Sequence, residues 1–90
     1  MPEQTIADRV RRLVVEAAPI AVGRVHAGMV LTDDLGYDSL SLLELMGLLE
    51  AEFDLPPVDG DFRSVRTLQD AEDMVRRVLD ARRSRPRTPA

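Results

Sequence analysis

The chain has 90 residues, 44% hydrophobic and only 3% aromatic, which is typical of one small domain with an aliphatic core and little room for a deep catalytic cavity. It contains no cysteine, which excludes disulfides, thiolate metal sites and thiol nucleophiles, and it has no apolar run of the roughly 20 residues that span a bilayer. The net charge is −4, but residues 33–61 hold nine acids and no arginine, so the centre of the chain repels nucleic-acid phosphates and attracts basic protein surfaces.

The first predicted helix runs from about Thr5 to Ala18. Thr5 and Asp8 have the T-x-x-D spacing of a capping box with Asp in place of the usual Glu. Pro19 cannot continue a helix, so it marks the end. The apolar residues recur at helical spacing and form one stripe: Ile6, Val10, Leu13, Val14 and Ala17.

Residues 19–38 show no sustained period and are predicted to form a long loop. A loop of this length in a compact domain is uncommon unless it is functional or held in place. Apolar residues recur throughout it, so we expect an ordered crossover that lies across the helices, with Gly23, Gly28 and Gly36 at its tight bends. These apolar residues are Ile20, Val22, Val25, Met29, Leu31 and Leu35.

A second helix is predicted to begin near Asp38 and to end before Pro56. Asp38 and Ser39 fall at this start, where Asp and Ser are preferred because their oxygens accept hydrogen bonds from unpaired backbone N–H groups. We expect Asp38 to cap the helix. Spacing alone therefore predicts that Ser39 is a cap or loop serine, and Ser41 with Glu44 matches the alternative capping box S-x-x-E. The predicted core stripe is Leu42, Leu45, Met46, Leu49 and Phe53, and the side chains left to water are Glu44, Glu50 and Glu52.

The last third of the chain predicts a short helical turn and a closing helix. Residues 59–66 have room for a turn or two, anchored by Phe62 and Val65. Thr67 and Asp70 give another T-x-x-D start, for a helix that reaches about Arg83. Its apolar stripe is Leu68, Ala71, Met74, Val75, Val78 and Leu79. We expect one domain over residues 1–83 and a disordered Arg- and Pro-rich tail over 84–90. Three long helices, one short helix and a long first loop predict an all-α four-helix bundle.

The run DDLGYDSLSLLEL, residues 33–45, resembles the attachment motif of acyl carrier proteins, in which Asp-Ser-Leu follows a glycine-containing loop. The order of elements is similar to that family over about residues 4–80. The resemblance implies that Ser39 carries a covalent 4′-phosphopantetheine arm whose thiol holds acyl groups as thioesters, with Asp38 and Leu40 beside the site. His26 is the only histidine and no base adjoins Ser39. The resemblance thus implies a non-catalytic carrier, loaded by a separate phosphopantetheinyl transferase that uses coenzyme A and magnesium.

The same resemblance implies a docking surface on the second helix. Glu44 and Glu50 are the first candidates for contacts with basic surfaces of ketosynthase, acyltransferase or ligase-type enzymes. Leu40 and Leu43 either add an apolar part to that surface or cover the edge of the core. Gly47 stands where a larger apolar residue is common in the family, and the space it leaves suits a partner side chain or an acyl chain.

LGYDSL, residues 35–40, especially resembles stand-alone carriers of bacterial polyketide and antibiotic biosynthesis. A primary fatty-acid carrier and a peptidyl or aminoacyl carrier are the alternatives within the family. Outside it, the alternatives are an acidic helical interaction module and a calcium-binding protein, although the aspartates do not have the spacing of an EF-hand loop. We expect a cytoplasmic monomer that binds neither nucleic acid nor a membrane.

Overall fold

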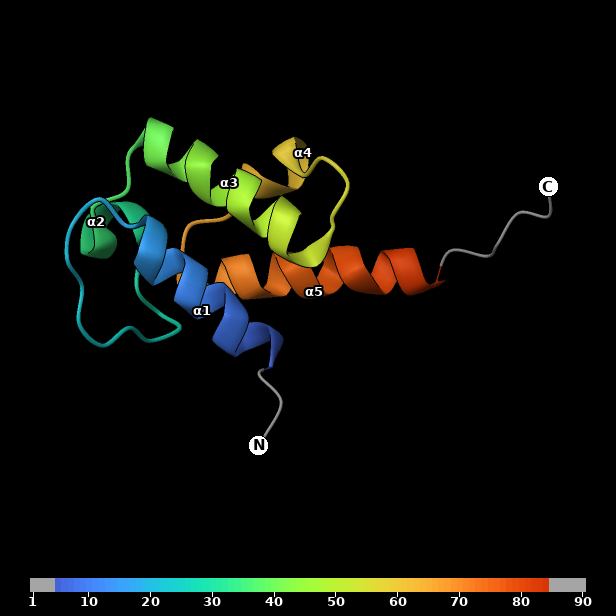
Figure 1. The fold of residues 1–90 in the computed structure, drawn as a ribbon, viewed down its shortest axis with the longest axis horizontal. Coiled ribbons are helices and arrows are strands. Elements are labelled where there is room, and N and C mark those ends of the chain that lie inside the picture. The colour runs from blue at the N-terminus through green and yellow to red at the C-terminus, as the bar shows by residue number, and fades with distance from the viewer. Residues whose placement is uncertain (1–4, 85–90) are drawn as a thin grey trace.

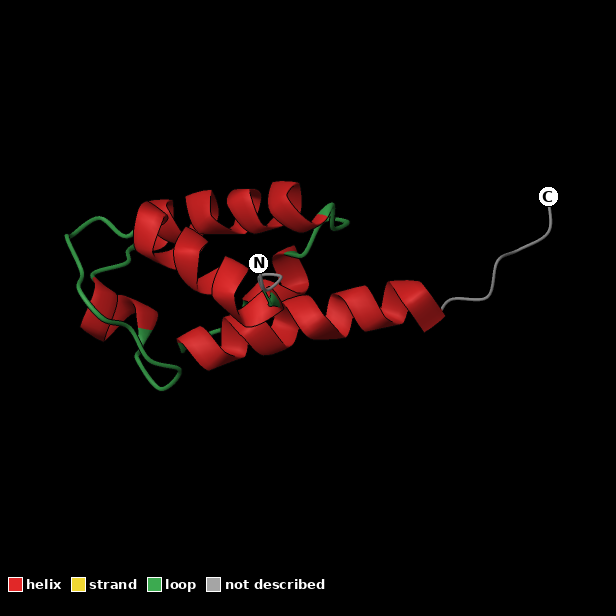
Figure 2. Ribbon diagram, turned by 60° about the horizontal axis from the view of Figure 1, so that its bottom comes forward, coloured by secondary structure: helices red, strands yellow, loops and turns green. Residues whose placement is uncertain are grey.

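The computed structural model describes residues 5–84, which form five α-helices and no strand. They are α1 (Ile6–Ala17), α2 (Leu31–Leu35), α3 (Ser39–Phe53), α4 (Asp59–Phe62) and α5 (Leu68–Ser84). Helix α1 packs against both α3 and α5, and the short α4 packs against α5 (Figure 1). Figure 2 shows the long connection between α1 and α2 at the end of the molecule opposite the end of α5. The all-α prediction is confirmed, with one more short helix than predicted, and residues 85–90 of the predicted tail lie outside the described residues.

One aliphatic core joins the three long helices, and it uses the predicted stripes. The fully or nearly fully buried members are Val10, Leu13 and Val14 of α1, Leu45, Leu49 and Phe53 of α3, and Leu68, Ala71, Met74 and Val75 of α5. The remaining stripe residues are partly buried at its edge. The hydrophobic stabilisation of the fold therefore comes from aliphatic side chains at helical spacing. None of the helices within residues 5–84 combines the length and apolar character of a membrane span.

Both predicted T-x-x-D capping boxes form. At α1, the Asp8 N–H donates to Thr5 Oγ1 at 3.0 Å and the Thr5 N–H donates to Asp8 Oδ2 at 3.4 Å. At α5, the Asp70 N–H donates to Thr67 Oγ1 and the Thr67 N–H to Asp70 Oδ2, both at 3.1 Å. Each pair satisfies backbone donors that the first turn leaves without partners.

The prediction of a loop from 19 to 38 is wrong for residues 31–35, which form α2. The Val30 N–H at its start donates to Asp34 Oδ2 at 2.7 Å, and Gly36 ends it with a left-handed φ of 74° that glycine adopts without strain. A five-residue helix is too short to show a period in the sequence.

The rest of this connection is the ordered crossover that we expected. Its backbone pairs with the start of α5: the Leu68 N–H donates to the Met29 carbonyl at 3.0 Å and the Gln69 N–H to the Ala27 carbonyl at 2.8 Å. The Leu31 N–H in turn donates to the Arg66 carbonyl at 2.9 Å. These hydrogen bonds hold α2, and the turn that follows it, against the bundle.

Glu72 is the one buried acid in the described part of the chain, and the sequence analysis did not identify it. Its side chain is only 3% exposed and forms ion pairs with Arg11 of α1 at 3.4 Å and with Arg76 one turn further along α5 at 3.9 Å. A buried carboxylate needs such partners because desolvation penalises the charge. The pair joins α1 to α5 at the side of the core.

Candidate functional site

The start of α3 is closed by reciprocal hydrogen bonds between Asp38 and Ser41. The Ser41 N–H donates to Asp38 Oδ1 at 2.9 Å, and the Asp38 N–H donates to Ser41 Oγ at 2.8 Å. The Ser41 hydroxyl also lies 2.9 Å from the same carboxylate oxygen. The hydrogen bonds from the Ser41 backbone, and then from its hydroxyl, hold the pKa of Asp38 below its ordinary value because they favour the charged carboxylate. Asp38 caps the helix, as predicted.

This arrangement corrects two predictions. The capping box between Ser41 and Glu44 does not form, because Ser41 is the third residue of α3, is buried and directs its hydroxyl back to Asp38. Ser39 is neither the cap nor part of the preceding turn, because it is the first residue of the helix. The D-x-x-S pair competes with S-x-x-E for the same turn, and it is the D-x-x-S pair that closes the helix.

Ser39 is left exposed at the first position of α3. Because Asp38 and Ser41 satisfy each other, capping makes no use of the Ser39 hydroxyl, and within residues 5–84 that hydroxyl takes part in no hydrogen bond. The N-terminus of a helix favours negative charge through its aligned peptide dipoles, by about 0.3 to 1 kcal/mol at an exposed position. The structure thus offers a solvent-facing hydroxyl at a place that suits an attached phosphate.

Tyr37 fixes the backbone immediately before this site, a role that the sequence analysis missed. Its side chain is 4% exposed, and its hydroxyl donates to the Val14 carbonyl near the end of α1 at 2.6 Å. Its N–H donates to the Leu31 carbonyl of α2 at 3.0 Å. Burial raises the pKa of Tyr37 to about 12. The turn before Ser39 is therefore tied to both α1 and α2. The only sequence signal is that the chain has a single tyrosine, placed next to Asp38.

The solvent face of α3 is apolar beside Ser39. Leu40 is 67% exposed and Leu43 is 60% exposed, so the interpretation in which they cover the edge of the core is wrong. Leu48, which the sequence analysis did not single out, is 40% exposed, and Gly47 lies exposed between Leu43 and Leu48. Large hydrophobic side chains gathered on one exposed helix face are typical of a surface that binds a partner.

The three carboxylates of α3 have different surroundings. Glu44 is exposed and takes part in no hydrogen bond or ion pair within the described chain. Glu50 is half-buried and accepts a hydrogen bond from the Val58 N–H at 3.1 Å, which holds the loop before α4. Glu52 forms ion pairs with Arg9 at 2.9 Å and Arg12 at 3.2 Å. Of the two predicted docking acids, only Glu44 is free of internal partners.

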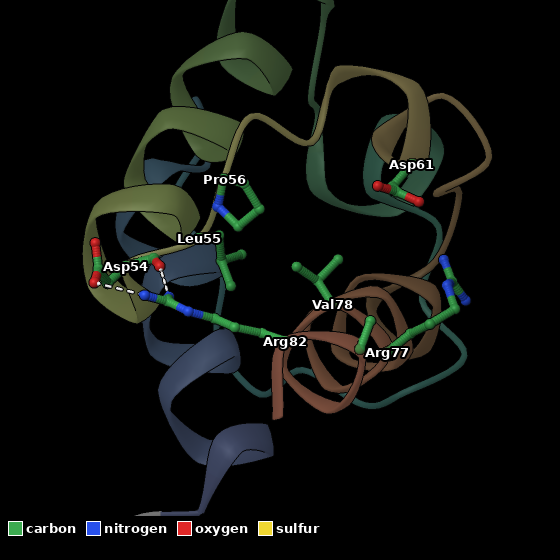
Figure 3. A pocket seen from close by; sticks show the side chains of 8 residues that line it. Asp54, Leu55, Pro56, Asp61, Arg77, Val78 and Arg82 are labelled. Atoms are coloured by element: carbon green, nitrogen blue, oxygen red, sulfur yellow. Dashed lines mark hydrogen bonds and ion pairs between the residues drawn. The ribbon is translucent and has the colours of Figure 1, made fainter. Parts of the chain in front are cut away.

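A cleft of about 510 Å³ lies at the other end of α3. In Figure 3, Leu55 and Val78 face each other across it, and Arg82 of α5 extends to the carbonyl and carboxylate of Asp54. Asp54 follows the 15 residues of α3, so the cleft is about 22 Å along the helix from Ser39. This cleft is separate from the exposed serine.

The described residues contain no group of three or more His, Cys, Asp or Glu side chains arranged to hold a metal ion. His26 is exposed in the connection between α1 and α2, where its backbone N–H contacts Met29 Sδ at 3.3 Å. What the start of α3 offers is the exposed Ser39 hydroxyl beside an apolar helix face.

Comparison with known proteins gives the class of this domain. Residues 8–75 match the family described as "Phosphopantetheine attachment site". The acyl carrier protein of Cyanidioschyzon merolae is 36% identical over 75 residues, which are 83% of this chain and 82% of that protein. A Mycobacterium tuberculosis structure assigned as an acyl carrier protein has a TM-score of 0.72 and 30% identity, over 80% of this chain and 96% of that one. The acetyl form of the actinorhodin acyl carrier protein from Streptomyces coelicolor has a TM-score of 0.64 and 29% identity, over 84% and 92%.

The fold and the match define a phosphopantetheine-binding carrier domain. More particularly, the chain belongs to the acyl carrier protein family. The cofactor of the family is 4′-phosphopantetheine, and its members are carriers that work with a phosphopantetheinyl transferase and with biosynthetic enzymes. The exposed hydroxyl at the start of α3 fits such a group, because a bulky arm there meets no buried side chain and its phosphate lies at the positive end of the helix dipole.

Proposed function

We propose that Ser39 carries the phosphopantetheine arm and that the chain shuttles acyl intermediates between enzymes of bacterial polyketide or other secondary metabolism. The single observation that supports the position is the Asp38–Ser41 capping box, which caps α3 and leaves the Ser39 hydroxyl exposed with no hydrogen-bond partner within residues 5–84. The arm's terminal thiol supplies the group on which acyl chains are held as thioesters.

Loading requires a catalyst from outside this chain. The Ser39 oxygen attacks the β-phosphorus of coenzyme A, forming a phosphodiester, while the bond to adenosine 3′,5′-bisphosphate breaks and the serine proton passes to a base of the transferase. The role of this chain is to present the oxygen: the capping box keeps Asp38 and Ser41 occupied, and Tyr37 holds the turn against α1. Leu40, Leu43 and Glu44 are the residues that an approaching enzyme meets first.

Two observations favour secondary metabolism. LGYDSL resembles the corresponding run of stand-alone polyketide carriers, and one structural neighbour is the actinorhodin acyl carrier protein with an acetyl group. We place the protein in the cytoplasm of a bacterium, with ketosynthase, acyltransferase or ligase-type enzymes as its partners. Because partners must bind and leave quickly, weak docking through a small surface suits this role.

The test is loading with acetyl-coenzyme A and a broad-specificity phosphopantetheinyl transferase, followed by intact mass spectrometry. We expect one acetylated arm on the wild type and no addition on Ser39→Ala. Hydroxylamine is expected to remove the acetyl group and leave the arm, because it cleaves thioesters and not phosphodiesters. A wild type that accepts no arm would contradict the proposed function.

A further inference from the structure

Ile20 is an exposed large hydrophobic residue outside α3. It follows the end of α1 by three residues and is 52% exposed. The other exposed large hydrophobic residues within 5–84 all belong to α3, and they are Leu40, Leu43 and Leu48. Val22, two positions further along the connection, is partly buried against the core, but Ile20 remains more than half exposed. Burial in the core therefore does not account for an isoleucine at this position.

The Ile20 side chain lies over the backbone of Gly36. A Cβ placed on Gly36 would come within 3.2 Å of Ile20 Cγ1 and within 3.3 Å of both Ile20 Cδ1 and Ile20 Cγ2. Gly36 is the glycine that ends α2 with a φ of 74°. Figure 1 shows the connection that leaves α1 passing beside α2 and the segment that leads to α3. Three carbons of the isoleucine thus fill the space that a side chain at Gly36 would take.

Gly36 is also the point at which the segment before Ser39 can rotate most easily. Residues 36–38 connect α2 to α3, and glycine has access to more backbone conformations than any other residue. Tyr37 holds this segment from within, because its buried hydroxyl donates to the Val14 carbonyl at 2.6 Å. Ile20 covers the same segment on the side that faces solvent, since Ile20 and Gly36 are both accessible in part. The two contacts together restrict rotation at Gly36.

Both contacts come from the same end of α1. Val14 lies in the last turn of that helix, and its carbonyl accepts the Tyr37 hydroxyl. Pro19 cannot continue the helix, so the chain turns there and brings Ile20 over Gly36. The connection from α2 to α3 is therefore held between the end of α1 and a residue that directly follows that end.

We propose that Ile20 is a positioning residue for the loading of Ser39. It restrains the backbone at Gly36, three residues before the serine, and so fixes the direction in which the start of α3 presents the Ser39 hydroxyl. A turn with more freedom presents the attacking oxygen in the reactive position less often, and the rate of a displacement depends steeply on that position. The inference rests on the proposed function and adds a residue that acts on Ser39 through Gly36, without contact with the enzyme.

The experiment makes two measurements on Ile20→Ala. The first is hydrogen exchange of the Tyr37 amide, whose N–H donates to the Leu31 carbonyl at 3.0 Å, in the carrier without an arm. We expect this exchange to be faster than in the wild type by about fivefold, because the contact over Gly36 is lost. The second is the kcat and KM of the carrier as substrate of a broad-specificity transferase with coenzyme A. We expect a kcat lower by about threefold and an unchanged KM, because the surface that the enzyme binds is intact.

Two further variants serve as controls. Ile20→Val keeps two of the three carbons that cover Gly36, and we expect it to restore the exchange rate and kcat to within about twofold of the wild type. Val22→Ala removes a partly buried side chain from the same connection. We expect it to lower the melting temperature and to leave the Tyr37 exchange rate and kcat unchanged, because Val22 packs against the core.

Three outcomes would overturn the inference and leave the proposed function intact. An unchanged kcat in Ile20→Ala would show that the contact does not position Ser39, whatever the exchange rate. A raised KM with an unchanged Tyr37 exchange rate would show that Ile20 contacts the enzyme directly. Equal effects of Val22→Ala and Ile20→Ala would show that any loosening of the connection is sufficient. A wild type that accepts no arm contradicts the proposed function instead, and the exchange rates still decide whether Ile20 restrains the turn.

Discussion

The carboxylate of Asp38 and the hydroxyl of Ser41 cap α3 together, with Asp38 Oδ1 2.9 Å from the Ser41 backbone nitrogen and Ser41 Oγ 2.8 Å from that of Asp38. Ser39 lies between them in the sequence and takes no part in the pair. Ser41 is buried because it forms the cap, and Ser39 is exposed because the cap does not use it.

The first prediction is that substituting these two serines changes the free energy of unfolding by different amounts. Ser41→Ala removes a capping partner and is expected to lower the free energy of unfolding by about 1 kcal/mol. Ser39→Ala removes no hydrogen bond and is expected to change it by less than about 0.5 kcal/mol. Urea unfolding followed by circular dichroism measures both. A larger loss from Ser39→Ala than from Ser41→Ala would contradict the geometry of the capping box.

The second prediction concerns acid. The folded pKa of Asp38 is below its ordinary value of 3.8, so its charge stabilises the fold above about pH 4, and this contribution is lost as the pH falls through the folded pKa. Asp38→Asn keeps the shape and removes the charge. We expect the wild type to be the more stable of the two at pH 6 and the difference to vanish towards pH 2. A difference that does not depend on pH would show that the charge contributes nothing to capping.

The third prediction concerns the Tyr37 anchor. Tyr37→Phe removes the donor to the Val14 carbonyl and is expected to cost about 1 kcal/mol. The folded pKa of about 12 exceeds the ordinary value of 10.0, so the stability associated with the neutral phenol is present below pH 10 and is lost as the pH rises towards 12. Absorbance titration of the single tyrosine measures this pKa directly. A native-state midpoint near 10 would mean that the phenol is not buried as described.

The fourth prediction distinguishes Glu44 from Glu50, both of them predicted docking residues. Glu50→Ala removes the acceptor of the Val58 N–H and is expected to lower the free energy of unfolding by about 1 kcal/mol. Glu44→Ala is expected to leave stability within about 0.5 kcal/mol of the wild type and to weaken the salt dependence of loading, because it removes the free charge of the docking face. Loading rates at low and high salt test this. Equal salt dependence in wild type and Glu44→Ala would contradict the assignment.

The sequence predicted the helices in which apolar residues recur over several consecutive turns. The three long helices each repeat apolar residues over several turns, and T-x-x-D marks two of their starts, so α1, α3 and α5 were predicted with nearly the observed bounds. Helix α2 was missed because five residues do not complete two turns. Two capping patterns overlap at Asp38, Ser41 and Glu44, and the sequence alone did not decide between them.

Long-range partners account for the rest of what the sequence left open. Glu72 is buried because Arg11, 61 residues earlier, lies beside it in the folded chain. Glu50 contacts the Val58 N–H only after the chain has turned at Asp54, the one non-glycine residue with positive φ in the described chain. No local pattern carries this information, so the identity of the free carboxylate on α3 had to come from the structure.

The most direct test of the account is to locate the arm. Wild type, Ser39→Ala and Ser41→Ala are each incubated with coenzyme A, magnesium and a broad-specificity transferase, then digested and sequenced by tandem mass spectrometry. We predict one phosphopantetheine on Ser39 of the wild type and of Ser41→Ala, and none on Ser39→Ala. An arm that persists in Ser39→Ala, or that is found on Ser41, would contradict it.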